Sequence, residues 1–139
     1  MHLVCIGKPG VDLYRTLSDS ETSRHILRFY HPKETPWGVT FEVATVSSGL
    51  AMASELRWYI MRYMKEVLFE DTEHDVYLTR DLAREVYETR SAALIEGWNI
   101  SFRVVILENG TSARVPDGVP DSPGVVQTFH VWGLAQEHP

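Results

Sequence analysis

The sequence predicts one α+β domain over residues 1–139, with two consecutive helices on one face of a mostly antiparallel sheet of about five strands. Segments with alternating apolar residues stand near both ends of the chain, and the middle repeats apolar residues at helical spacing. Asn109-Gly110 favours a tight turn between neighbouring antiparallel strands. With both helices on one face, we expect the other face of the sheet to be solvated or covered by a partner.

The N-terminal part of the chain favours strands. Residues 2–6 predict an apolar strand, which the turn over residues 7–10 ends. This turn contains Gly and Lys but lacks the spacing of a phosphate-binding loop. Residues 11–17 are long enough for two helical turns. Residues 24–31 alternate as a strand does, and residues 38–46 are the expected hairpin partner.

The central part of the chain favours two helices. Residues 47–69 predict a long amphipathic helix that Ser47 or Ser48 caps, with Leu56 and Ile60 on its core stripe. A second helix begins after the N-cap Thr79 and runs to residue 96, where Gly97 is a natural stop.

The C-terminal part returns to strands. Residues 99–107 alternate most regularly, and residues 111–115 and 125–132 are the next two strands expected. Residues 117–124 are rich in Pro, Gly and Asp and predict a mobile loop. Residues 133–139 are expected to be a frayed tail.

The composition is that of a soluble cytoplasmic protein. Cys5 is the single cysteine, so no intramolecular disulfide forms, and its apolar neighbours indicate a buried strand thiol. The formal charge of −6 argues against non-specific nucleic-acid binding, which needs Lys and Arg to neutralise phosphates. No apolar run is long enough to cross a membrane, and no signal peptide pattern is present.

A protein interface is predicted on the outer face of the first helix. Trp58 lies opposite the core stripe, with Met61 and Arg62 beside it, where a solvated helix normally carries Lys, Glu or Gln. Trp and Arg often carry binding energy, and Met adapts to irregular surfaces. The alternative is that the second helix or the loop over residues 116–124 covers Trp58.

An acidic connector follows that helix and contains Glu70, Asp71 and Glu73. It lacks the spacing of an EF-hand loop, and the chain contains no zinc motif, so we predict no metal and no cofactor. The connector is then a solvated turn, or a surface that meets a basic partner.

An alternative site lies on the polar face of the predicted sheet. Arg28, Tyr30 and Arg103, with His130, are expected there and would bind a phosphate or carboxylate. Cross-strand pairing of either arginine with Glu42 would need no ligand. Arg90 falls on the apolar face of the second helix, where a guanidinium must pair with a carboxylate or bind an anion.

No spacing typical of a catalytic triad or of a Cys-His pair appears, so no catalytic residue is predicted. The sequence therefore favours a small acidic non-enzymatic binding protein, an inhibitor or adaptor such as mobile elements and phages carry, with a protein partner or a homodimer. The alternative function is a small-molecule or nucleotide-binding protein, or an enzyme, that holds an anionic ligand on the sheet.

Overall fold

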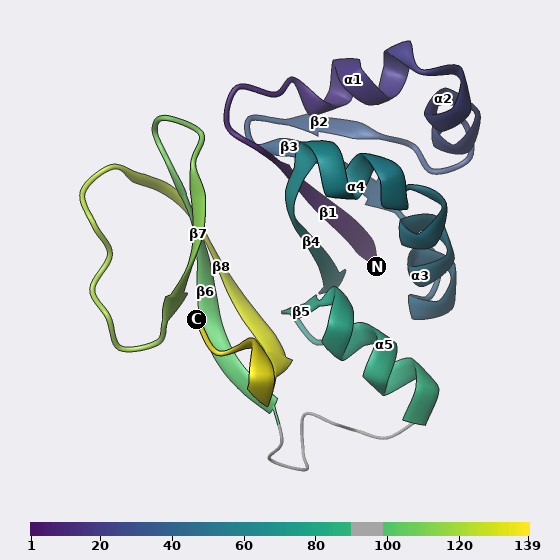
Figure 1. Cartoon of the computed structure of the whole chain (residues 1–139). Coiled ribbons are helices and arrows are strands. Elements are labelled where there is room, and N and C mark those ends of the chain that lie inside the picture. The colour runs from purple at the N-terminus through teal and green to yellow at the C-terminus, as the bar shows by residue number, and fades with distance from the viewer. Residues whose placement is uncertain (90–98) are drawn as a thin grey trace.

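A single eight-stranded mixed sheet organises the computed structural model, which describes residues 1–89 and 99–139 (Figure 1). The strands are β1 (His2–Gly7), β2 (Lys33–Thr35), β3 (Gly38–Glu42), β4 (Met64–Asp71), β5 (Val76–Thr79), β6 (Asn99–Leu107), β7 (Ser112–Pro116) and β8 (Val125–Leu134). The helices are α1 (Leu13–Asp19), α2 (Glu21–Leu27), α3 (Val46–Glu55), α4 (Arg57–Tyr63), α5 (Arg80–Thr89) and the 3₁₀ turn η1 (Ala135–Glu137). No helix in this part of the chain is both long and apolar enough to cross a membrane.

The strand order is β2-β3-β1-β4-β5-β8-β6-β7. Neighbouring strands are antiparallel except for β5 and β8, which pair in parallel. The α+β class is confirmed, but the prediction of about five strands was wrong and the sheet is mixed. The strands missed are β2 and β5, which are too short to show alternation, and β4, which was assigned to a helix.

Both faces of the central strands are buried. Leu3 and Phe69 face a core layer to which the helices contribute. Val4 and Leu68 face a second layer that contains Phe102 and other residues of β6 and β8. Figure 1 shows how this arises, since β6, β7 and β8 lie across from β1 and β4 rather than in one plane with them. The chain itself therefore covers the face that we expected to be solvated or covered by a partner.

The predicted helix over residues 47–69 is interrupted. Helix α3 ends at Glu55, α4 starts at Arg57, and residues 64–71 form β4 instead. Thr45, rather than Ser47 or Ser48, caps α3, because its Oγ1 accepts a hydrogen bond from the Ser48 backbone N–H at 3.1 Å. Strand β4 forms because it hydrogen-bonds to β1 on one side and to β5 on the other, and this pairing outweighs local helical periodicity.

The predicted strand over residues 24–31 is helical. Helix α2 occupies residues 21–27 and packs with α1 at the top of Figure 1. Ser23 and Leu27 are its buried residues, four positions apart, and Ser23 Oγ donates a hydrogen bond to the Leu17 carbonyl at 2.5 Å. The apolar residues of this segment fit both periodicities, and packing onto α1 selects the helical one.

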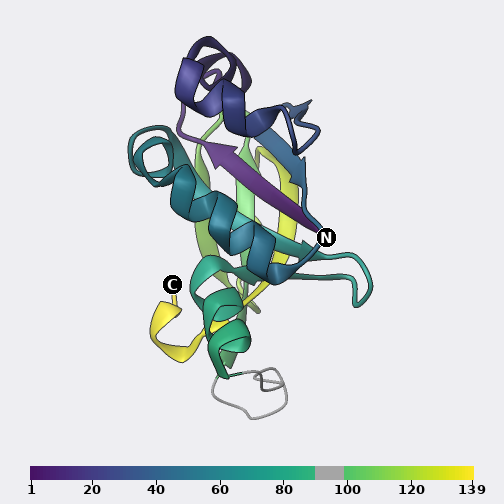
Figure 2. The same ribbon diagram turned by 90° about the vertical axis from the view of Figure 1, so that its right-hand side faces the viewer.

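The second predicted helix is α5, and its N-cap is confirmed because Thr79 Oγ1 accepts a hydrogen bond from the Leu82 N–H at 3.1 Å. The predicted helix end at residue 96 and the stop at Gly97 lie outside the described residues. Residues 117–124 connect β7 to β8, and residues 133–137 complete β8 and form η1. Figure 2 shows α3 lying across β1 and β4, with α5 below it.

Candidate functional site

Helix α4 presents its outer face to solvent because its inner face is fixed by the core. Tyr59 is 8% exposed, and its hydroxyl contacts the Ser20 hydroxyl at the start of α2. Lys8 Nζ, from the loop after β1, donates a hydrogen bond to the Met61 carbonyl at 3.1 Å. These two contacts anchor the middle of this short helix, and the direction of its outer side chains is therefore set.

The outer face of α4 carries an exposed aromatic cluster. Trp58 is 52% exposed and Met61 is 72% exposed. The guanidinium carbon of Arg62 lies 4.4 Å from the centroid of the Trp58 ring. The rings of Tyr59 and Tyr63 meet the Trp58 ring at steep angles, with centroids 5.0 and 5.9 Å away. We call Trp58, Met61, Arg62 and Tyr63 the Trp58 surface.

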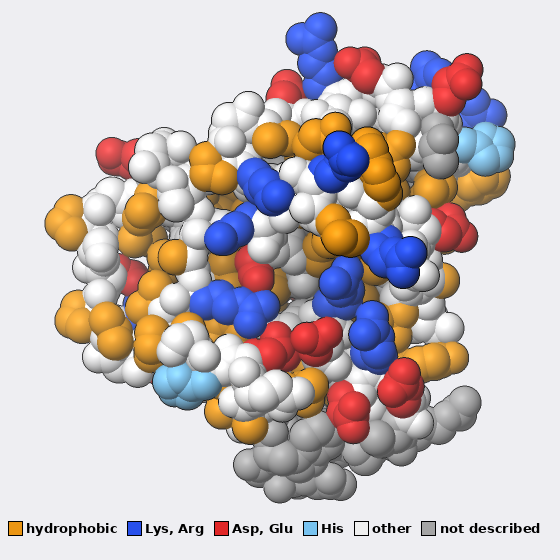
Figure 3. Space-filling model, in the orientation of Figure 1, with side chains coloured by type: hydrophobic (Ala, Val, Ile, Leu, Met, Phe, Trp, Pro, Cys, Tyr) orange, Lys and Arg blue, Asp and Glu red, His pale blue; other side chains and the backbone are white. Residues whose placement is uncertain are grey.

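Basic side chains surround the Trp58 surface. Figure 3 shows Lys and Arg side chains gathered with apolar ones over α4 and α5, with Asp and Glu side chains among them. A small hollow of about 140 Å³ lies between these elements, with Ile60 and Met64 beside Lys65, Arg80 and Arg114 in its wall. The sequence predicted only part of this gathering, Arg62 beside Trp58, because Arg80 and Arg114 come from separate segments.

The acidic half of the predicted interface lies elsewhere. Glu70 and Asp71 end β4 and Glu73 follows it, and Asp71 lies six positions along the strand from Lys65, which is roughly 20 Å. Glu70 accepts a hydrogen bond from the Tyr77 hydroxyl at 2.8 Å and pairs with His2 Nδ1 at 3.0 Å. The two predicted halves therefore do not form one continuous surface.

The turn after β4 has its own electrostatics. Asp71 Oδ2 lies 2.8 Å from His74 Nδ1, and Asp71 Oδ1 accepts hydrogen bonds from the N–H groups of Glu73 and His74. The carboxylate hydrogen bond raises the pKa of His74. Partial burial acts to raise the pKa of Asp71, but the His74 ring outweighs it, so that pKa is lowered.

Asp71, Glu73 and His74 each bring a ligand atom within 4.8 Å of the others. The hydrogen bonds that shape the turn account for this proximity, so we assign no ion to it.

The residues predicted for the alternative anion site do not come together in the fold. Arg28 ends α2 and Tyr30 follows it, so neither lies on a strand, whereas Arg103 is in β6 and lies opposite His130 of β8. Four strands separate β3, which Tyr30 contacts, from β6 in the sheet order. The expected shared strand face for Arg28, Tyr30 and Arg103 was therefore wrong.

Arg103 is instead a structural residue. Its guanidinium forms an ion pair with Asp121 and donates hydrogen bonds to the carbonyls of Pro116 and Val119. It ties the loop over residues 117–124 to β6, with Asp121 as its partner in place of the Glu42 of the alternative cross-strand pairing. Arg90, the last residue of the predicted anion set, lies outside the described residues.

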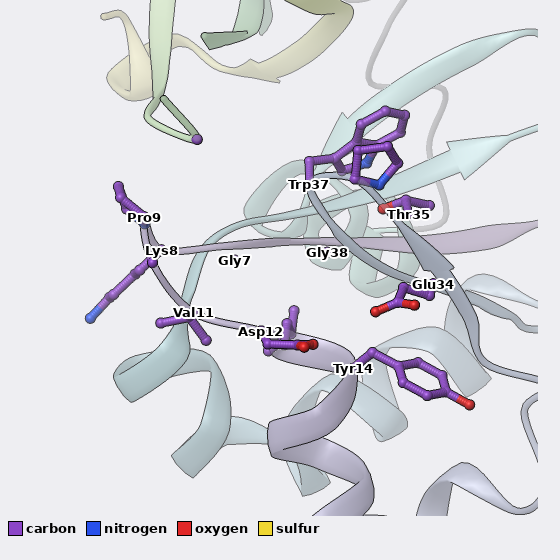
Figure 4. Close-up of a pocket in the computed structure, with 14 residues that line it drawn as sticks. Gly7, Lys8, Pro9, Val11, Asp12, Tyr14, Glu34, Thr35, Trp37 and Gly38 are labelled. Atoms are coloured by element: carbon purple, nitrogen blue, oxygen red, sulfur yellow. The ribbon is translucent and has the colours of Figure 1, made fainter. Parts of the chain in front are cut away.

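A larger hollow of about 520 Å³ lies where the loop after β1 meets the β2–β3 hairpin. Figure 4 shows the carboxylates of Asp12 and Glu34 pointing into it beside Tyr14, while Lys8 extends away. Asp12 also caps α1, because its Oδ1 accepts a hydrogen bond from the Arg15 N–H at 3.1 Å. The hollow is thus acidic, which agrees with reading the Gly-Lys loop as a turn rather than as a phosphate site.

Cys5 is a core residue and not a nucleophile. Its side chain is 1% exposed between β3 and β4, and burial raises the pKa of the thiol to about 12. The thiolate fraction near neutral pH is therefore negligible. The buried strand thiol that the sequence predicted is confirmed.

Comparison with curated proteins and with solved structures gives no match. A family model matches residues 1–97 of the 139-residue chain. The matched segment runs from β1 through α5 and contains the Trp58 surface, whereas β6, β7 and β8 follow it. The chain therefore belongs to the family of unknown function DUF5804.

Proposed function

We propose that this chain is a non-enzymatic binding protein, an inhibitor or adaptor, whose Trp58 surface contacts a protein partner. The observation that supports this most is the half-exposed ring of Trp58, which Arg62 covers on one side while Met61 stands uncovered beside it. An aromatic and a methionine left in water on one short helix form the kind of apolar patch that marks an interaction site.

The rigidity of the cluster favours binding. Trp58 is held between the rings of Tyr59 and Tyr63 and the Arg62 guanidinium, so its side chain is ordered before any partner arrives. Ordering a flexible side chain at an interface costs about 0.5–1.5 kcal/mol, and a preordered one avoids that cost. Trp, Tyr and Arg are also the residue types most often found at binding hot spots.

A small-molecule function has less support. The arginines that the sequence assigned to an anion site lie on separate parts of the fold, and Arg103 already forms an ion pair with Asp121. The acidic hollow near Asp12 and Glu34 would repel the anionic ligand that this alternative requires.

Site-specific photocrosslinking in the source cells tests the proposed function. A photoreactive amino acid replaces Met61, and a matched control places it at Phe29, which is also exposed (71%) but follows α2. We expect a discrete adduct of higher mass from position 61 that Trp58→Ala abolishes, and none from position 29. The absence of an adduct at position 61, or the same adduct at both positions, would contradict the proposal.

A further inference from the structure

We infer that the segment that docks on the Trp58 surface is an acidic stretch of a foreign protein, rich in Asp and Glu and carrying an apolar side chain. This inference rests on the proposed function and names the chemistry of its partner. Two observations support it. Cations stand next to the Trp58 surface, and these cations are not in ion pairs with carboxylates of the described residues.

Five cations in α4, α5 and the segments next to α4 form what we call the basic rim. They are Lys8, Arg57, Lys65, Arg80 and Arg84. Arg57 is one helical turn from Met61 in α4, and Arg84 is one turn from Arg80 in α5. Ile60 of α4, Lys65 of β4 and Arg80 of α5 line the same small hollow, so these three elements meet there.

The basic rim lacks carboxylate partners. Among the described residues, the arginines in ion pairs are Arg15, Arg103 and Arg114, and none of the rim cations is in one. Two carboxylates at the hollow, Glu66 and Glu137, are already paired with Arg114, and their side chains are 11% and 8% exposed. Asp81 lines the hollow as well, so its three cations face three carboxylates, and the positive excess comes from Lys8, Arg57 and Arg62 on and beside α4.

This excess stands out against the rest of the chain. The rim and Arg62 hold six of the thirteen Lys and Arg residues of a protein whose formal charge is −6. Such separation of charge steers an oppositely charged partner to one side of the molecule and disfavours like-charged ones.

The small hollow shows how an acidic side chain fits. Its wall combines the apolar side chains of Ile60 and Met64 with the cations Lys65 and Arg80 and with Asp81, while Glu66 and Glu137 in the same wall are paired with Arg114. The methylene groups of a Glu would lie on the apolar part, while its carboxylate reaches the cations. An apolar side chain of the same segment would then lie against Trp58 and Met61.

Two other occupants fit less well. A second copy would have to offer its acidic turn, yet Glu70 and Asp71 of that turn are held by hydrogen bonds within their own chain. A nucleic acid needs phosphate-neutralising cations along an extended path, whereas this surface is confined to α4, α5 and their neighbours on a strongly acidic molecule.

The photoreactive amino acid at position 61 also tests the inference, because the peptide joined to it can be sequenced by mass spectrometry. We expect a segment of another protein with at least about one-third Asp and Glu. A neutral or basic segment, a segment of this same chain, or a nucleic-acid adduct would overturn the inference and leave the surface as an interface. No adduct at all would instead defeat the proposed function.

Charge-reversal variants give a quantitative test of the inference, because the yield of the crosslinked adduct can be compared between them. The pair Arg57→Glu and Arg84→Glu should lower adduct yield at least tenfold, because two attractive contacts become repulsive. The matched control pair, Arg24→Glu and Arg28→Glu, places the same charge change on and just after α2 and should leave the yield within about twofold. Circular dichroism verifies that both variants fold. Equal yields from both pairs would overturn the inference.

Discussion

Arg114 and Glu66 are 48 residues apart in the chain, yet Arg114 Nη2 donates a hydrogen bond to Glu66 Oε1 at 2.8 Å. Arg114 Nε donates to the same oxygen at 3.0 Å, and Nη1 donates to Glu137 Oε2 at 3.2 Å. Partial burial acts to lower the pKa of Arg114, but its bonds to Glu66 outweigh this and raise it. One guanidinium thus links β7 to β4 and to η1.

The Arg114→Ala variant should lower the free energy of unfolding by about 1–3 kcal/mol, because it leaves two mostly buried carboxylates without a cation. Urea denaturation measures the loss. The control is Arg15→Ala, whose partner Asp19 is 72% exposed and 3.7 Å away, and which should cost less than about 0.5 kcal/mol. Equal losses would mean that the Arg114 bonds contribute no more than a surface ion pair.

Truncation should destabilise the fold much more at Leu56 than at Trp58. Leu56 is fully buried, so Leu56→Ala should cost about 2–5 kcal/mol of folding free energy. Trp58→Ala should cost about 1 kcal/mol or less, because half of the ring is already in water. Thermal and urea unfolding of both variants provide the test. A collapse of stability in Trp58→Ala would show that the ring is a core residue.

Gly38 is required by the close approach of β3 to β1. A Cβ at this position would lie 2.0 Å from the Cys5 carbonyl oxygen, and backbone cannot move aside as a flexible side chain does. Gly38→Ala should therefore destabilise the fold by about 1–3 kcal/mol or more. Gly7→Ala is the matched control, since its nearest contact would be an ordinary 3.5 Å. Similar melting temperatures for the two variants would contradict the steric argument.

The His74 ring should titrate above its ordinary pKa of 6.5, because Asp71 stabilises the protonated form. The folded-state pKa is raised, so this pair stabilises the fold fully below pH 6.5 as long as Asp71 is ionised, and it ceases to do so as the pH rises through the folded-state value of His74. A proton NMR titration measures the shift, and Asp71→Asn should return the pKa toward 6.5. A His74 pKa unchanged by that substitution would refute the assignment.

Local patterns in the sequence predicted a large part of the fold. Residues 2–6 and 99–107 form β1 and β6, and Thr79 caps α5, because alternation and capping depend on near neighbours in the chain. The exposure of Trp58 also follows locally, since the residue lies away from the buried positions of its own helix.

Pairing between distant strands determined the features of the fold that local sequence patterns did not predict. Residues 64–71 have helical periodicity but become β4, because hydrogen bonds to β1 and β5 satisfy the backbone on both sides. The bend that brings β6 and β8 over β1 and β4 gives the sheet its second buried layer. Because the bend depends on contacts between distant segments, no pattern among neighbouring residues predicts it.

The sequence by itself determined the α+β class and the buried Cys5, and it favoured an exposed aromatic at position 58, because each of these depends on spacing within one segment. Only the tertiary structure decided which charges meet. It separated Arg28 from Arg103, moved the acidic turn away from Trp58, and brought Lys65 and Arg80 together beside α4. The reason is physical, because electrostatic contacts depend on distance in space, and the order of strands sets that distance independently of separation along the chain.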